Sequence, residues 1–284
     1  MFPIIFSFGP FTLYTFNIFL IVGAVGAAFL FWQRTHAEHF EDDEVFDVMI
    51  ISTVMALIIA RIAYIVLHLT TIFMEWKEWL VVLTKPGFDE LTALVVGLWY
   101  IWFLSRRKKW DAYELADFAT VSISFLLIFV WIGRFFAGTF LGDVTKLPIG
   151  VTFPNVFDMR HPSQLYFAFL FLFVYVLLLW IEKKYRFFQW YRAGRHTANS
   201  GFVLSIFLSL YGLFHLLMAT IDLQQVVVFG IRLDLFFYIV MMFYGLGLLF
   251  ARSGSNTFSK KKWGKTASTG DSAKRSRVRF WGKK

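Results

Sequence analysis

The chain has 284 residues, of which 58% are hydrophobic and only 17% are charged, and its formal net charge is +9. A soluble domain carries about 45–50% apolar and about 25% charged residues, so this composition excludes a soluble globule and indicates a protein embedded in lipid. The sequence holds no cysteine, which excludes disulfides, thiolate metal sites and cysteine nucleophiles.

Seven apolar stretches could cross a bilayer as helices, for which about 20 mainly apolar residues are needed. In chain order they are residues 11–32, 45–69, 91–104, 115–136, 164–181, 201–221 and 233–250, the third being short. The sequence therefore predicts an all-α, polytopic membrane protein of about seven transmembrane helices. Residues 1–251 would form the transmembrane domain.

Lysine and arginine gather in every second connection between these stretches. The connections after the third and fifth stretches hold Arg106, Arg107, Lys108 and Lys109, and then Lys183, Lys184, Arg186, Arg192 and Arg195. The even-numbered connections hold few. Because cytoplasmic loops are enriched in Lys and Arg, this alternation predicts an N-terminus outside and a C-terminus in the cytoplasm.

Residues 252–284 differ from the rest in being rich in Lys, Arg, Ser and Gly. This composition predicts a disordered cytoplasmic tail, and an alternative is a clamp on anionic lipid headgroups. Nucleic acid is not an expected partner, because no folded recognition module accompanies the charge.

Ionisable groups inside the predicted spans are candidates for function, because burying them in lipid is costly. Arg61 would either pair with an acid such as Asp47 or bind an anionic group such as a phosphate. Arg134 would either reach the outer headgroup layer or serve a site. Asp117 fits a helix cap, and His215 fits either a packing role or a catalytic one.

The densest polar segment is 160–166, which reads Arg-His-Pro-Ser-Gln-Leu-Tyr at the outer end of the fifth span. A proline in the first helical turn is favoured, because its missing N–H has no partner there. His161, Ser163, Gln164 and Tyr166 would then lie at headgroup depth near a positive helix end. Such a group suits a phosphate or glycerol headgroup, although it could also simply fasten helices together.

At this segment the chain resembles the prolipoprotein diacylglyceryl transferase family, of which the same seven-residue string is the most recognisable motif. Residues 5–10, 60–67, 117–118 and 211–214 resemble further family segments in the same order. The resemblance implies seven spans in the bacterial cytoplasmic membrane and an active side that faces outward. It also implies transfer of diacylglyceryl from phosphatidylglycerol, or a similar anionic phospholipid, to the cysteine thiol of a prolipoprotein signal peptide.

The chain departs from the family at several polar positions of the fourth and sixth spans. The fourth-span signature reads Gly-Arg-x-Gly-Asn-Phe-x-Asn-Gly-Glu, where this chain has Val-Trp-Ile-Gly-Arg-Phe-Phe-Ala-Gly-Thr over residues 130–139. Its arginine falls on Trp131 and its acid on Thr139, while a sixth-span arginine falls on His215. Arg134 lies one helical turn after Trp131, so its long side chain could reach the same phosphate.

The predicted catalytic residues are accordingly Arg134, His161 and His215. The predicted lipid-binding residues are Arg61, Ser163, Gln164, Tyr166 and Tyr211, and neither a metal nor another cofactor is expected. Two alternatives to an active transferase stay open. One is an inactive relative that binds phospholipid or lipoprotein precursors, and the other is a transporter or assembly subunit built on a similar bundle.

Overall fold

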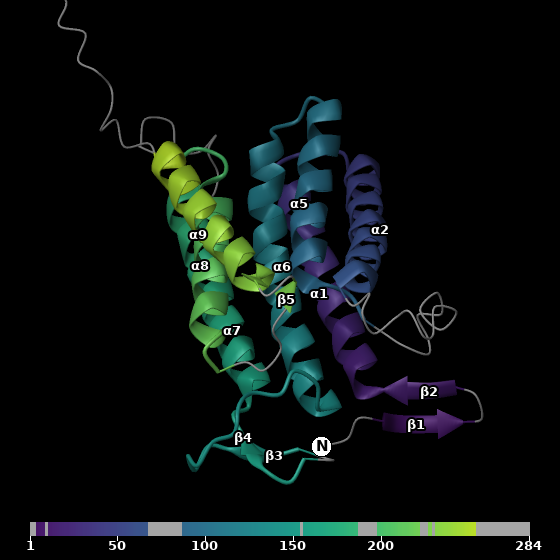
Figure 1. Ribbon diagram of the computed structural model, residues 1–284. Helices are drawn as coiled ribbons and strands as arrows, with labels where there is room; N and C mark the ends of the chain where they lie inside the picture. The colour runs from purple at the N-terminus through teal and green to yellow at the C-terminus, as the bar shows by residue number, and fades with distance from the viewer. Residues whose placement is uncertain are drawn as a thin grey trace, which may run out of the picture. The chain divides into compact units, whose positions relative to one another are not determined.

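The computed structural model describes residues 4–8, 11–67, 87–153, 156–186, 198–221, 227–228 and 231–253 (Figure 1). In these ranges the chain forms seven α-helices and three short antiparallel hairpins. The helices are α1 (Thr15–Ala37), α2 (Asp42–Leu67), α5 (Glu90–Arg107), α6 (Ala112–Ala137), α7 (Ser163–Ile181), α8 (Phe202–Met218) and α9 (Leu233–Arg252). The hairpins pair β1 (Ile4–Phe8) with β2 (Phe11–Tyr14), β3 (Val151–Thr152) with β4 (Met159–Arg160), and β5 (Val227–Val228) with β6 (Ile231–Arg232).

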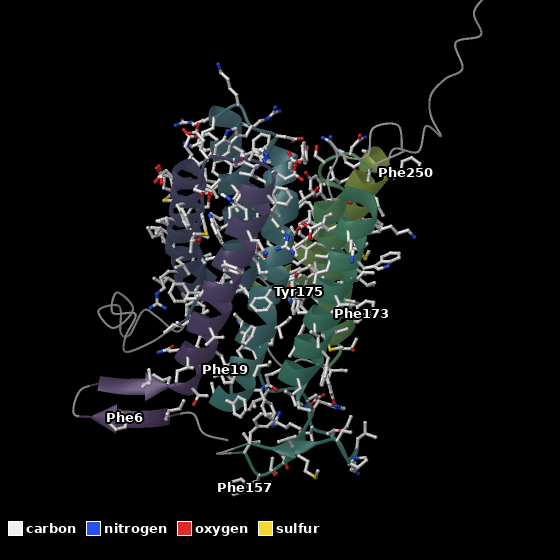
Figure 2. All side chains as sticks on the ribbon, turned by 180° about the vertical axis from the view of Figure 1, so that it is seen from behind. Phe6, Phe19, Phe157, Phe173, Tyr175 and Phe250 are labelled. Atoms are coloured by element: carbon white, nitrogen blue, oxygen red, sulfur yellow. The ribbon has the colours of Figure 1, made fainter. Side chains whose placement is uncertain are left out.

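Five of these helices, α1, α2, α6, α7 and α9, are long and apolar enough to cross a membrane. α8 is apolar but has only 17 residues, and α5 carries charged residues at both ends. Phe173 on α7 and Phe250 on α9 lie on the outer surface with 56% and 59% of their area exposed (Figure 2). The predicted all-helical, multi-pass membrane architecture is thereby confirmed, while the number of spans and their orientation stay predictions.

Most helix boundaries differ by a few residues from those predicted, as α1, α8 and α5 illustrate. α1 begins at Thr15 rather than at residue 11, because residues 11–14 form β2 and pair with β1. α8 ends at Met218, three residues before the predicted end of its span. α5 starts one residue earlier than expected, at Glu90. Residues 68–86 and the predicted basic tail, apart from residues 252 and 253, lie outside the described ranges.

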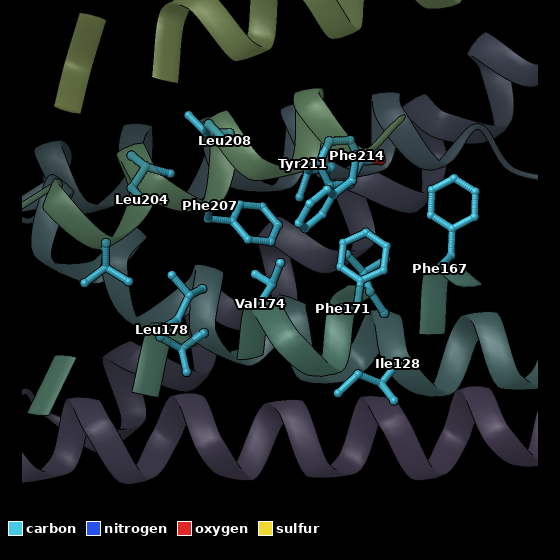
Figure 3. Packing of buried hydrophobic residues seen from close by; sticks show 14 of the residues in the cluster. Ile128, Phe167, Phe171, Val174, Leu178, Leu204, Phe207, Leu208, Tyr211 and Phe214 are labelled. Atoms are coloured by element: carbon cyan, nitrogen blue, oxygen red, sulfur yellow. The ribbon is translucent and has the colours of Figure 1, made fainter. Parts of the chain in front are cut away.

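The central helix is α6, against which α1, α5, α7 and α8 all pack. Glycine permits a close approach of α1 to α6, since a Cβ added to Gly23 of α1 would lie 2.8 Å from the Cβ of Phe129. On the other side of α6, the aromatic side chains of α7 and α8 interlock around Phe171 and Tyr211, whose ring centroids are 5.8 Å apart (Figure 3).

The two ends of the bundle differ in character. The α5–α6 connection and the C-terminal end of α9 lie at one end, whereas the strands β1 to β4 lie at the other (Figure 1). At the former end, Arg34 Nε donates to Glu182 Oε1 at 3.0 Å and ties α1 to the end of α7. Asp117 is a helix cap, as predicted, but it caps α8: its two carboxylate oxygens accept from Gly201 N and Leu204 N at 2.8 Å.

Candidate functional site

Glu90 is the first residue of α5, so it lies at the end of this helix that is opposite the α5–α6 connection. The preceding Asp89 caps the helix by accepting a hydrogen bond from Thr92 N at 2.7 Å. A carboxylate in the first turn is favoured by the positive end of the helix dipole. The Glu90 side chain is only 17% exposed, so its two oxygens depend on protein partners.

Arg134 lies in the last turn of α6 and donates from Nη1 to Glu90 Oε2, forming an ion pair. Its guanidinium contacts two aromatic rings that pack edge-to-face with each other, with Cζ 4.3 Å from the ring centroid of Trp131 and 4.1 Å from that of Phe140. The side chain is 11% exposed and has its acid partner inside the bundle. These contacts favour a role in a site over the alternative in which Arg134 reaches the outer headgroup layer, and both stay predictions.

Two nitrogens of Arg134, Nε and Nη2, have no hydrogen-bond partner among the described residues, and neither is fully buried. A guanidinium presents five N–H donors in a planar fork that matches phosphate oxygens. Glu90 thus occupies one side of the fork and leaves the other side available to an anion.

Tyr211 and His215 extend from successive turns of α8, and their rings stack with centroids 4.1 Å apart. Tyr211 Oη donates to Glu90 Oε1 at 3.2 Å. His215 Nδ1 lies 2.9 Å from the carbonyl oxygen of Tyr211. Because a carbonyl only accepts, we assign the ring proton to Nδ1. Nε2 then faces Glu90 Oε1 at 4.0 Å.

Side chains from α5, α6 and α8 thus meet on one carboxylate, and we refer to Glu90, Arg134, Tyr211 and His215 as the Glu90 cluster. It combines a cation that can bind phosphate with an imidazole that can accept a proton. In the described part of the chain, no three His, Asp or Glu side chains lie close enough together to hold a metal ion.

An apolar wall borders the Glu90 cluster on the α6–α7 side. Trp131 stacks on Phe167 with centroids 4.1 Å apart, and Phe167 in turn lies 4.8 Å from the ring of His215. Trp131 is 2% exposed, and its Nε1 has no hydrogen-bond partner among the described residues. An apolar wall lowers the local dielectric constant, which strengthens the interaction of Arg134 with any bound anion.

The segment 160–166 fastens the loop that follows α6. Ser163 Oγ donates to the carbonyl oxygen of Phe140 at 2.8 Å, and Gln164 Nε2 donates to that of Thr139 at 2.5 Å. The ring of His161 contacts Tyr166 Oη at 3.2 Å. The bonds of Ser163 and Gln164 hold Phe140 over Arg134, so these two residues support the site from behind. Their binding of lipid stays a prediction, as does that of Tyr166.

Arg61 lies beside the start of α5. Its Nη1 donates to the carbonyl oxygen of Gly87 at 2.7 Å, and its guanidinium carbon is 5.9 Å from the ring centroid of Phe88. Asp47 is 14 residues earlier in the same helix, which is about 21 Å at 1.5 Å per residue. The suggested pair of Arg61 with Asp47 is therefore wrong. Arg61 instead contacts Gly87, which precedes Glu90 by three residues.

Glu90 is the one member of the Glu90 cluster that the sequence did not single out. Its signal was the acidic pair at residues 89 and 90, immediately before the short apolar stretch 91–104. Such a pair reads as a helix start, and Asp89 does have that role. The structure adds that the second acid points to α6 and α8.

Known proteins resemble this chain over most of its length. The sequence model of the prolipoprotein diacylglyceryl transferase family matches residues 3–251. The phosphatidylglycerol–prolipoprotein diacylglyceryl transferase of Clostridium tetani is 26% identical over 215 residues, which cover 74% of this chain and 81% of that protein. The protein of the same name from Coxiella burnetii is 28% identical over 218 residues, covering 75% and 78% of the two chains. This chain belongs to the prolipoprotein diacylglyceryl transferase family.

Proposed function

We propose that this protein transfers the diacylglyceryl group of phosphatidylglycerol to the lipobox cysteine thiol of a prolipoprotein signal peptide. It would act in the bacterial cytoplasmic membrane as a multi-pass protein of seven spans, with its N-terminus outside and its C-terminus in the cytoplasm. The Glu90 cluster, at the end opposite the basic connections, would then face outward, on the side where an exported precursor presents its thiol.

The observation that carries the proposal is the meeting of Arg134 and His215 on one carboxylate within this family's fold. Arg134 would bind the lipid phosphate through Nε and Nη2 and stabilise the charge that develops as the phosphate leaves. His215 would accept the thiol proton at Nε2, because a thiolate is the nucleophilic form of sulfur. Of the two predicted catalytic histidines, the contacts favour His215 for this step.

The reaction then balances without a further reagent. The cysteine S–H bond breaks and its proton passes to His215. A sulfur–carbon bond forms at the glycerol carbon of the diacylglyceryl group, while the bond from that carbon to the phosphate oxygen breaks. The electron pair stays on the phosphate, which takes the proton from His215 and leaves as glycerol phosphate.

The remaining predicted residues would line the path of the lipid headgroup. Arg61 supplies a second cation near the start of α5, and His161 with Tyr166 supplies donors at the entry to α7. Tyr211 would contribute indirectly, because its hydroxyl is donated to Glu90.

A second candidate is an inactive relative that binds phospholipid or lipoprotein precursors. It is favoured by Trp131, which stands where the family signature has arginine. The Trp131 side chain is buried in the apolar wall. Its case depends on whether Arg134 and Glu90 replace the lost polar groups.

The test is transfer itself. Purified protein is mixed with phosphatidylglycerol and a peptide that bears a lipobox cysteine, and the mass of the peptide is followed. We expect a gain of one diacylglyceryl group, blocked when serine replaces the cysteine of the peptide. Folded protein that binds phosphatidylglycerol but gives no mass gain, beside an active relative, would support the second candidate.

A further inference from the structure

Glu90 contacts every polar member of the cluster, which suggests a role beyond that of a structural ion-pair partner. We infer that Glu90 is a positioning residue for diacylglyceryl transfer, which orients Arg134 toward the lipid phosphate and supports His215 as it takes up a proton. The inference rests on the proposed function and assigns a role to a residue at which the family signature gave no sign.

The first step concerns Oε2 and Arg134. Trp131 and Phe140 lie against the guanidinium with their ring centroids 4.3 Å and 4.1 Å from Cζ. These two rings pack edge-to-face and cover adjacent sides of the guanidinium. The ion pair of Nη1 with Glu90 Oε2 turns that nitrogen to the carboxylate, so that the opposite edge of the fork, formed by Nε and Nη2, is directed away from Glu90. The available edge of the fork is therefore set by the contact with Glu90.

The second step concerns Oε1 and His215. Tyr211 Oη holds this oxygen at 3.2 Å, and the stacked imidazole presents Nε2 to it at 4.0 Å. Once Nε2 has accepted the thiol proton, the imidazolium is an ion-pair partner of the carboxylate. Among the described residues, the titratable or charged groups that face His215 are Glu90, Arg134, Tyr211 and Tyr238, and of these only Glu90 is a carboxylate.

The third step concerns the charge of Glu90 itself. A carboxylate on one side of the guanidinium opposes a phosphate on the other side, so Glu90 weakens binding of the lipid while it orders the reacting groups. Removing the charge alone should therefore act in opposite directions on affinity and on turnover. A residue with only a structural role would not produce that split.

A matched control stands at the other end of the bundle. Glu182 pairs with Arg34 Nε at 3.0 Å, and the two side chains are 9% and 11% exposed. This pair equals that of Glu90 and Arg134 in chemistry and is at least as well buried. Its loss reports what breaking a buried Arg–Glu pair does to this fold alone.

The experiment compares Glu90→Gln, Glu90→Asp and Glu182→Gln with the wild type as full-length proteins in detergent. Each is examined for its folded fraction, its Kd for a short-chain phosphatidylglycerol, and kcat for the lipobox peptide per folded protein. For Glu90→Gln we expect kcat to fall about 100-fold, the scale of a misplaced reacting group. We expect its Kd to fall roughly tenfold, as the opposing charge is removed.

Glu90→Asp should recover part of kcat, because it restores the charge on a shorter side chain. Glu182→Gln should leave both Kd and kcat within about threefold of the wild type, since the lost ion pair lies away from the Glu90 cluster and affects only folding. The inference is overturned if Glu90→Gln keeps kcat, if its Kd rises, or if Glu182→Gln loses kcat to the same extent.

The Kd arm separates this inference from the proposed function. If the wild type binds phosphatidylglycerol without turning it over, the proposed function fails. Even then, tighter binding by Glu90→Gln would place the phosphate near Glu90, on the other side of Arg134. Unchanged or weaker binding would reject that placement as well.

Discussion

Replacing Arg134 with alanine removes the cation to which the proposed chemistry assigns the lipid phosphate. In the wild type, Nη1 is held by Glu90 while Nε and Nη2 remain available. Loss of one donor to a developing oxyanion lowers kcat by about 10²–10³-fold. Because Arg134→Ala removes both available nitrogens, we expect turnover to fall by at least about 10³-fold, or ~4 kcal/mol of transition-state stabilisation.

The same substitution also affects stability. It leaves the Glu90 carboxylate without its cation at 17% exposure. Removing one partner of a buried pair costs about 3–5 kcal/mol. Arg34→Ala is the matched control, because Arg34 is 11% exposed and pairs with Glu182 away from the site. We expect the two variants to lose similar stability, and only Arg134→Ala to lose turnover per folded molecule.

The assay follows the mass gain of the lipobox peptide at fixed amounts of folded protein, determined by size-exclusion chromatography and thermal unfolding. Arg134→Lys adds a graded case, since an ammonium keeps the charge but lacks the planar fork. We expect it to retain a small fraction of the wild-type rate. Turnover of Arg134→Ala within about tenfold of the wild type would refute the assignment of the phosphate to this residue, because the missing donors would then not act in the transition state.

Three further substitutions test other parts of the structure. Asp117→Ala leaves two buried N–H groups at the start of α8 unpaired and should lower the free energy of unfolding by about 2–4 kcal/mol; an unchanged denaturation midpoint would contradict the cap. Gly245→Val should separate α9 from α8, because a Cβ there would lie 2.5 Å from Ser209 N, and a wild-type melting temperature would argue against that close approach. Tyr211→Phe removes the hydroxyl that holds Glu90 and should reduce kcat by about three- to tenfold with little change in folded fraction, whereas full activity would make the hydroxyl dispensable.

The helices could be predicted from sequence because the length of an apolar stretch is enough to indicate a lipid-exposed span. Their exact ends could not, since these depend on pairing with distant residues. Residues 11–14 are apolar enough to extend α1, yet they form β2 because residues 4–8 offer a partner strand. The acid at Asp117 was predicted to cap a helix, but nothing local indicates that the helix is α8, whose capped residue Gly201 is 84 positions away.

The residues of the site were likewise predictable where the signal is local and unpredictable where it depends on distant partners. Arg134 and His215 were predicted because a charged or titratable residue inside an apolar span is conspicuous. Glu90 was missed because it adjoins Asp89 at a helix start, where an acid is ordinary. Ser163 and Gln164 were conspicuous as polar residues, but their partners are the backbone carbonyls of residues 140 and 139, which only the folded loop brings to them.

The central claim is that the lipid phosphate binds beside Arg134 within reach of His215. Its most direct test is a cryo-electron microscopy structure of the protein in a nanodisc with a non-transferable phosphonate analogue of phosphatidylglycerol. The account predicts phosphonate oxygens within hydrogen-bond distance, about 2.7–3.2 Å, of Arg134 Nε or Nη2, and the glycerol carbon on the side of His215. A phosphonate bound at Arg61 or on the outer surface, with Arg134 held only by Glu90, would contradict it.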